Sequence, residues 1–438
     1  MLILMTNNTF TKVREVFKNG APGEKVLLRG WVHRKMEVKN RVFLVLRDST
    51  GTIQCVVHKD SVPESVWSKA KAITRESSFI VEGVVKPDKR APGGLEITVS
   101  NIEIVGISSI FPIFGRESVE YLLDNRHLWI RSRKLTAVFK VKHTVLDACR
   151  EFFLKRGWWE VTPPIITMSA CEGGATLFEL NYFGEKAYLS QSAQLYLEVL
   201  IYSLEKVWAI TPSFRAEKSR TRRHLSEYTH LEAEASWYNM EDMMRVTEDL
   251  IHHVVKRVLE ERLEELEFLG RKTELLEDLK PPFPRITYDE AIDVLRRQGL
   301  PIDWGEDLGA DEERKLTENF DTPFFITLFP KKIKAFYMKL CPSNPELVLG
   351  FDMLAPEGYG EIIGGSQRED DYDNLLARII EAGLNPEEYK WYLDLRKYGS
   401  VPHSGFGLGV ERLVMWITGL DHIRDATPFP RFRERAYP

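Results

Sequence analysis

The sequence predicts an α+β protein in which a small β-barrel precedes a larger domain of strands and helices. Five short strand-like segments crowd into residues 20–105, whereas 137–155 and 241–268 carry apolar residues at helical spacing. A chain of 438 residues exceeds one ordinary hydrophobic core, so two or three domains are expected. We expect a barrel domain over 1–106 (with 1–19 as an extension of open role), a connector over 107–135 and the larger domain over 136–438.

The composition is that of a globular protein, with 43% hydrophobic and 29% charged residues. The net charge of −5 excludes a globally basic chain, so a nucleic-acid partner would need local basic patches. The four cysteines are far apart in sequence, which excludes a CxxC zinc site and favours free thiols in the cytoplasm. No stretch approaches ~18 apolar residues and the apolar run at the N-terminus is short, so we expect neither a membrane span nor a signal peptide.

The N-terminal segments read as strands separated by turns such as Ser49-Thr50-Gly51. Five strands in under about 100 residues favour a small barrel, with the OB-fold as the first candidate and another small β-domain as the alternative. The segments are Lys25–Val32, Val42–Asp48, Thr52–Val57, Ser78–Gly83 and Leu95–Val99.

The larger domain is expected to open with a long helix over Ala137–Lys155, which Arg156-Gly157 would end. A strand over Trp158–Val161 follows, and Pro163-Pro164 breaks it. An ordinary buried helix and strand would show the same pattern. Further helices are expected over 241–268, as a packing helix, and over 288–298.

Residues 213–234 are the most informative stretch. Two strands joined by a cationic loop would place alternate side chains on one face. Such a face suits a triphosphate and a second polyanion, although a solvated basic turn is the ordinary alternative. The residues concerned are Arg215 and Glu217 before the loop, and Tyr228, His230, Glu232 and Glu234 after it.

A second glycine-rich strand runs over Gly405-Phe406-Gly407-Leu408-Gly409. It lacks the GxGxxG spacing of a dinucleotide-binding loop. A strand without side chains lets a flat base lie against the backbone, although close packing of strand on helix is the alternative. Arg412 is expected to open a helix and to stack on the other face of the base, which contributes about 0.5–2 kcal/mol.

These stretches resemble motifs 2 and 3 of the class II aminoacyl-tRNA synthetases, in the aspartyl/asparaginyl branch, and the helix–strand unit ending at Pro163 resembles motif 1. The resemblance covers roughly 20–438. It implies an antiparallel sheet flanked by helices, a homodimer built on motif 1, and ATP, an amino acid and a tRNA as substrates, with Mg²⁺ as the cofactor.

The resemblance assigns an ATP site in which Arg215 matches the α-phosphate, Tyr228 stacks on adenine and Arg412 caps the base. Glu361 would be the magnesium ligand, with Asp352 as a weaker second. Some relatives carry a serine at the position of Gly364, where it contacts the metal or the substrate. In this chain only the backbone could make that contact. The implied catalytic residues are Arg215, Glu217 and Arg412; the implied ATP-binding residues are Arg215, Ala216, Glu217, Arg223, His224, Leu225, Tyr228, Glu361, Gly409, Val410, Glu411 and Arg412.

The amino-acid pocket would take Glu172, in a mobile glycine loop, for the substrate ammonium. The aspartyl branch has a lysine where this chain has Leu197, and usually an aspartate where it has Glu232. The Glu232 carboxylate can accept a hydrogen bond from the amide NH₂ of a substrate side chain, and Arg368 can donate to the amide oxygen. This pair predicts asparagine as the substrate and resembles the archaeal type of asparaginyl enzyme. The implied pocket residues are Glu172, Gln191, Gln194, Leu197, Arg215, Glu232, Gly364 and Arg368.

Other functions stay open. The alternatives are an aspartyl enzyme, which could be non-discriminating, an asparagine synthetase-like paralogue and a non-enzymatic tRNA-binding module. In the barrel, the resemblance points to Arg29, Phe43 and Gln54 as anticodon-binding residues of a chain acting on tRNA(Asn), with Phe43 stacking on a base. A core aromatic in a half-buried strand is the ordinary interpretation of Phe43.

Overall fold

The computed structural model describes residues 9–171, 176–216 and 221–438. Its internal contacts divide the chain into two compact units, Met1–Ser118 and Val119–Pro438. This division falls inside residues 107–135. In the described part of the chain, we find no helix with the length and apolar character needed to cross a bilayer.

The first unit is a closed five-stranded barrel in the order β1-β2-β3-β5-β4. Alternate residues such as Val42, Leu44 and Leu46 of β2 point into its core. All five predicted strands are present. Their bounds are β1 Lys25–Val38, β2 Arg41–Arg47, β3 Thr52–His58, β4 Ser78–Pro87 and β5 Leu95–Gly106, with helices α1 Val13–Asn19 and α2 Glu64–Ala72.

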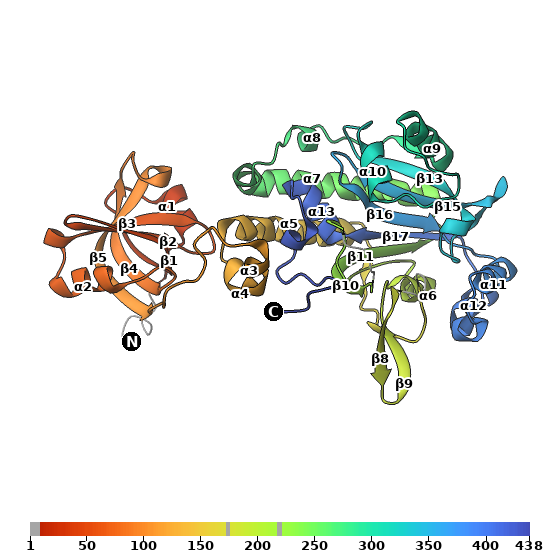
Figure 1. Ribbon diagram of the computed structural model, residues 1–438, viewed down its shortest axis with the longest axis horizontal. Coiled ribbons are helices and arrows are strands. Elements are labelled where there is room, and N and C mark those ends of the chain that lie inside the picture. Colours follow the sequence, from red (N-terminus) through yellow and green to blue (C-terminus); the bar gives the residue numbers. More distant parts are fainter. Residues whose placement is uncertain (1–8, 172–175, 217–220) are drawn as a thin grey trace. The chain divides into compact units, whose positions relative to one another are not determined.

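A large sheet forms the centre of the second unit, in the order β12-β13-β15-β16-β17-β11-β10-β6 with β14 paired to β15 (Figure 1). Its pairings are antiparallel except β12–β13 and β10–β6. The strand bounds are β6 Trp159–Glu160, β10 Lys206–Phe214, β11 Glu227–Ser236, β12 Arg285–Thr287, β13 Phe324–Pro330, β14 Leu340–Cys341, β15 Asn344–Ala355, β16 Gly360–Gln367 and β17 His403–Gly409.

Three helices cover one face of this sheet: α5 (Arg133–Lys155), α7 (Met240–Leu269) and α13 (Val410–Thr418). Alternate residues Leu231 and Ala233 of β11 and Phe406 of β17 are buried in the same core as these helices. Helix α5 is followed by Gly157 at φ +72°, as the Arg-Gly signal predicts. Helix α13 begins two residues earlier than predicted, so Arg412 lies in its first turn and does not open it.

The remaining elements surround the sheet. A small sheet, β7-β9-β8, lies close in sequence to α6. The bounds are β7 Ile166–Thr167, β8 Phe178–Tyr182, β9 Glu185–Leu189, α3 Val119–Asp124, α4 Arg126–Trp129, α6 Gln194–Leu204, α8 Glu274–Glu277, α9 Tyr288–Arg297, α10 Ala310–Thr317, α11 Tyr372–Glu381 and α12 Lys390–Lys397.

Candidate active site

The sheet face turned away from α5, α7 and α13 carries the polar residues of β11. Tyr228, His230, Glu232 and Glu234 alternate with the buried apolar residues of that strand, as the sequence predicts. The register sets His230 opposite Gly409, Glu232 opposite Gly407 and Glu234 opposite Gly405. The side chains of β11 therefore lie beside three glycines of β17, and on this side of β17 the strand carries only the side chain of His403, at its start.

The glycines of β17 do two different things. A Cβ atom at position 405 would lie 1.8 Å from Glu234 Oε2, and one at 407 would lie 2.3 Å from His230 Nε2. For a Cβ at 409, the three nearest atoms belong to the stem of Arg412, at 3.5 Å or more. The Glu234 carboxylate fills the space that a side chain at position 405 would take, whereas Gly407 and Gly409 both line the first pocket. That a flat base lies against this strand stays a prediction.

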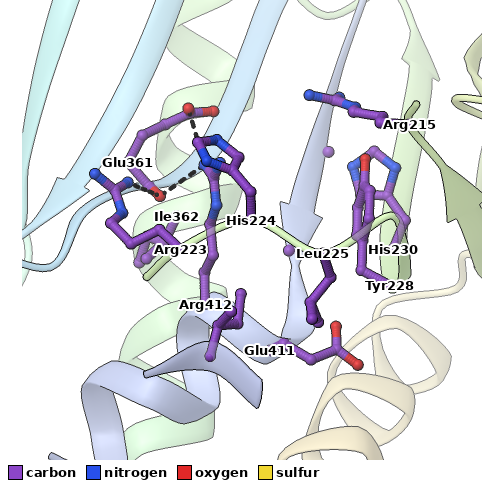
Figure 2. A pocket seen from close by; sticks show the side chains of 13 residues that line it. Arg215, Arg223, His224, Leu225, Tyr228, His230, Glu361, Ile362, Glu411 and Arg412 are labelled. Carbon is purple, nitrogen blue, oxygen red and sulfur yellow. Dashed lines mark hydrogen bonds and ion pairs between the residues drawn. The ribbon is translucent and has the colours of Figure 1, made fainter. Parts of the chain in front are cut away.

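The first pocket opens over this face between β10, β11, β16 and the start of α13 (Figure 2). Arg215 follows the end of β10, with its guanidinium carbon 5.6 Å from the centre of the Tyr228 ring. Among the predicted ATP residues, the lining includes Arg215, Arg223, His224, Leu225, Tyr228, Glu361, Gly409, Glu411 and Arg412.

Glu361 is the electrostatic centre of the first pocket. Arg412 Nη1 lies 3.0 Å from both the carboxylate Oε2 and the carbonyl oxygen of Glu361, and Arg223 Nη2 donates to that carbonyl at 3.0 Å (Figure 2). Burial raises the pKa of Glu361, but Arg412, Lys334, Arg223 and Arg215 outweigh it and lower the pKa to about 2. One ionised carboxylate thus lies among four cations, of which Arg215, Arg223 and Arg412 line this pocket.

A second pocket adjoins the first along the same face. It shares Arg215, His230, Glu361 and Gly407 with the first, and it extends over β16 and β15. Its lining also includes Ser192, Gln194, Leu197, Glu232, Ala233, Glu234, Asp307, Ile333, Lys334, Ala335, Tyr337, Met338, Asp352, Gly364, Gly365, Arg368 and Phe406.

Glu232 is buried in the wall of the second pocket. One oxygen accepts from the Ser192 hydroxyl; the other accepts from the Ala193 amide at 2.8 Å and lies 3.3 Å from His230 Nδ1. Burial raises the pKa of Glu232, but His230, Ser192 and the Ala193 amide outweigh it and hold the pKa below its usual value. The pocket therefore contains a fixed negative charge at neutral pH.

Arg368 supplies the opposite charge. Its Nη2 and Nε contact Glu234 at 2.9 and 3.1 Å, and its Nη1 donates to Ser366 at 2.7 Å. A guanidinium has five N–H donors, so two remain beyond these three contacts. Arg368 and Glu232 together present donors and a carboxylate acceptor to the same cavity.

Two carboxylates converge over Gly364. A Cβ there would lie 3.2 Å from Glu361 Oε1 and 3.5 Å from Asp352 Oδ1. Burial raises the pKa of Asp352 to about 7, Glu361 adds to the rise, and Lys334, 2.6 Å away, opposes it. Hard divalent cations prefer oxygen ligands, so this carboxylate pair fits such an ion, whose charge would relieve the repulsion.

Four predicted residues take positions outside the two pockets or act as supports. Val410 is buried at the start of α13, and Ala216 pairs through its amide with the Thr176 carbonyl. Gln191 donates to the Thr176 hydroxyl at 2.8 Å. Glu411 accepts from the Thr229 amide at 2.9 Å and from Lys142 at 2.6 Å, so it ties α13 to β11 and α5. Glu172 and Glu217 lie outside the described residues.

The sequence interpretation missed other residues of the site. His230 and Glu234 were placed on the shared face by alternation, but no role was assigned to them. Lys334 and Asp307 come from segments without a motif, and only the fold brings them to the pocket.

In the barrel unit, the three predicted anticodon residues lie on strands. The guanidinium of Arg29, which is exposed, lies 4.3 Å from the centre of the Phe10 ring. Gln54 donates to Glu96 at 3.0 Å, and the Phe43 side chain is half-buried. Their role in binding RNA stays a prediction.

Comparisons with known proteins agree with this architecture. A family model described as tRNA synthetases class II (D, K and N) matches residues 118–433, and an OB-fold nucleic acid binding domain matches 26–105, which confirms the predicted fold class. The asparagine–tRNA ligase of Pyrococcus furiosus is 60% identical over 95% of this chain and 96% of its own length. That of Thermoplasma acidophilum is 51% identical over 97% and 99%, respectively. The crystal structure of asparaginyl-tRNA synthetase from Pyrococcus horikoshii complexed with asparaginyl-adenylate superimposes with a TM-score of 0.95 at 59% identity, covering 98% of this chain and 100% of that one.

Proposed function

The chain belongs to the class II aminoacyl-tRNA synthetases of the aspartyl, lysyl and asparaginyl group, and on that premise we propose that it joins L-asparagine to tRNA(Asn) through an asparaginyl-adenylate. The observation that carries this proposal is the pair of adjoining pockets on one sheet face. One is lined by cations around Glu361, and the other by Glu232 and Arg368.

In the first step, the α-carboxylate of asparagine attacks the α-phosphate of ATP, which forms the adenylate and releases pyrophosphate. Arg215 lines both pockets, so its guanidinium lies where the two substrates meet and balances charge on the α-phosphate. Tyr228 and Arg412 hold the adenine between them, and Arg223 and His224 take the outer phosphates. The reaction needs no side-chain nucleophile, so positioning and charge stabilisation carry it.

Side-chain recognition depends on the sign of the charges in the second pocket. The Glu232 carboxylate accepts from the carboxamide NH₂ of asparagine, and a spare donor of Arg368 reaches the carboxamide oxygen. Aspartate would set its carboxylate against the ionised Glu232, and Leu197 offers it no compensating cation. Leaving a buried charge unpaired costs several kcal/mol, which favours asparagine.

Mg²⁺ accompanies ATP in this proposal. Glu361 and Asp352 are the residues that would hold it, because their carboxylate oxygens converge over Gly364. Held there, Mg²⁺ would supply charge neutralisation for phosphate oxygens. Gly364 has no side chain to add to the pair.

The acyl group then passes to the 3′-terminal adenosine of tRNA(Asn), with the barrel reading the anticodon through Arg29, Phe43 and Gln54. A tRNA substrate implies the cytoplasm. We assign a homodimer built on α5, β6 and Pro163, and Trp159 of β6 is exposed at the edge of the sheet in the single chain, which supports that assignment.

The test is ATP–pyrophosphate exchange with each of the two amino acids in the absence of tRNA. Asparagine should support exchange with kcat/KM at least about tenfold above that for aspartate. Equal exchange with aspartate would refute the proposed specificity for asparagine. The absence of exchange with either amino acid would refute adenylate formation.

A further inference from the structure

A cluster of charged side chains lies fully buried behind the wall of the second pocket. Its centre is Glu198 of α6, whose side chain is 0% exposed, as is that of Arg396 from α12. Glu198 Oε2 accepts from Arg396 Nη2 at 2.7 Å and from the Tyr392 hydroxyl at 2.7 Å, and lies 3.0 Å from His403 Nε2. None of these contacts involves the reacting groups assigned above, yet burying such charges is costly.

Glu198 reaches the pocket through two residues that line it. Its Oε1 accepts from Gln194 Nε2 at 3.0 Å and lies 3.9 Å from Arg368 Nε. Arg368 is therefore shared between two carboxylates, since Glu234 contacts the same guanidinium at 2.9 Å. The position of the Arg368 guanidinium, and how far its positive charge is balanced, therefore depend on both Glu198 and Glu234.

The cluster also has the composition of a metal site, because ligand atoms of Glu198, Glu234 and His403 lie within 4.8 Å of one another. Arg368 and Arg396 already pair with these carboxylates. The cationic partners are thus protein side chains, and the cluster acts as a charge balance for the pocket. Burial raises the pKa of Glu198, but Arg396, His403 and Arg368 outweigh it and hold the pKa well below its usual value.

We propose that Glu198 is a positioning residue that sets the preference for asparagine over aspartate, because its buried negative charge behind Arg368 opposes a second carboxylate in the pocket. Aspartate carries one negative charge more than asparagine, so a fixed carboxylate nearby disfavours aspartate and leaves asparagine nearly unaffected. A unit charge roughly 8 Å from the substrate carboxylate, at an effective dielectric constant of about 20, changes the ratio of kcat/KM for asparagine to that for aspartate by roughly 30-fold. This inference rests on the proposed function of the second pocket.

The experiment measures kcat/KM for asparagine and for aspartate by ATP–pyrophosphate exchange with the full chain. Glu198→Gln keeps the shape and removes the charge, so the asparagine-to-aspartate ratio should fall by roughly 10- to 30-fold. Tyr392→Phe is the matched control, because it removes a hydrogen bond from the same carboxylate and no charge. Its ratio should stay within about twofold of the wild-type value.

A second variant keeps the test valid if Glu198→Gln fails to fold. Glu198→Gln combined with Arg396→Met removes the two partners of the ion pair together, which buried pairs often tolerate. Arg396 contacts Oε2 of Glu198, whereas Arg368 of the pocket lies 3.9 Å from Oε1, so the removed carboxylate is nearer the pocket than the removed cation. The asparagine-to-aspartate ratio should therefore still fall, by about threefold. A folded double variant with the wild-type ratio would overturn the inference.

The outcomes separate this inference from the proposed function. If the wild-type chain fails to exchange with asparagine, the proposed function is wrong. If it exchanges with asparagine and folded Glu198→Gln keeps the wild-type ratio, only the role of Glu198 is refuted.

Discussion

Gly407→Ala tests the geometry of the shared wall between the two pockets. The added Cβ would lie 2.3 Å from His230 Nε2. Carbon and nitrogen atoms pack at about 3.5 Å, so the imidazole must move by about 1 Å. His230 Nδ1 lies 3.1 Å from Ser213 Oγ and 3.3 Å from Glu232 Oε2, and a shift of this size breaks at least one of these contacts.

The expected effect follows from the loss of one contact to an ionised group. Hydrogen bonds to charged groups contribute about 1.5–3 kcal/mol, and a loss of about 2 kcal/mol corresponds to roughly a 30-fold fall in kcat/KM for asparagine. Overpacking in addition costs about 1–3 kcal/mol of stability. A thermal melt therefore accompanies the exchange assay, to show that the variant is folded.

Gly409→Ala provides the comparison within the same strand. The three atoms nearest to its Cβ belong to the stem of Arg412, at 3.5 Å or more, and Gly409 lines the first pocket alone. We expect it to raise the KM for ATP and to leave the KM for asparagine within about threefold of wild type. Wild-type kcat/KM for asparagine in folded Gly407→Ala would refute the reasoning about His230.

Three further predictions follow from the site and the barrel. Arg215→Ala should lower exchange by at least about 100-fold, and a variant within a few-fold of wild type would remove Arg215 from the reaction. Leu197→Lys buries an ammonium at a position that is 1% exposed, so it should lower the free energy of unfolding by several kcal/mol; a wild-type urea midpoint would contradict this. Combined with Glu232→Asp, it should shift the preference towards aspartate, and an unchanged ratio of kcat/KM for the two amino acids would contradict that. Because the folded-state pKa of Asp352 is raised to about 7, stability in metal-free buffer should fall as pH rises from about 4 through 7, and Asp352→Asn should flatten that fall in urea titrations.

Local patterns predicted much of this site because alternation in a strand is a strong constraint. Tyr228, His230, Glu232 and Glu234 had to share a face once residues 227–236 formed a strand, and the buried Leu231 and Ala233 fixed which face it was. The glycines of 405–409 were located correctly, but their close approach to the side chains of Glu234 and His230 was not predicted. The side chains that fill the space above Gly405 and Gly407 belong to another strand, and pairing register is not written in either segment alone.

The residues that escaped prediction depend on contacts between distant segments. Glu198 lies inside an ordinary helix, and its partners Tyr392, Arg396 and His403 follow 194–205 positions later. Lys334 sits in a short connector, and its partner Asp352 was noted only as a second acid. Nothing in the neighbouring residues of such groups distinguishes a buried ion pair from a surface charge.

The shared lining of the two pockets supports the proposed reaction, in which no general base takes part. Arg215, His230, Glu361 and Gly407 line both cavities, so the place where nucleophile and phosphate meet is fixed by the register of β11, β16 and β17 and by the end of β10. The attacking carboxylate is already ionised at neutral pH, and the leaving pyrophosphate needs charge neutralisation more than a proton. The protein must therefore supply a rigid binding surface that holds the two substrates together next to fixed charges. Paired strands with glycine at the points of closest approach supply it.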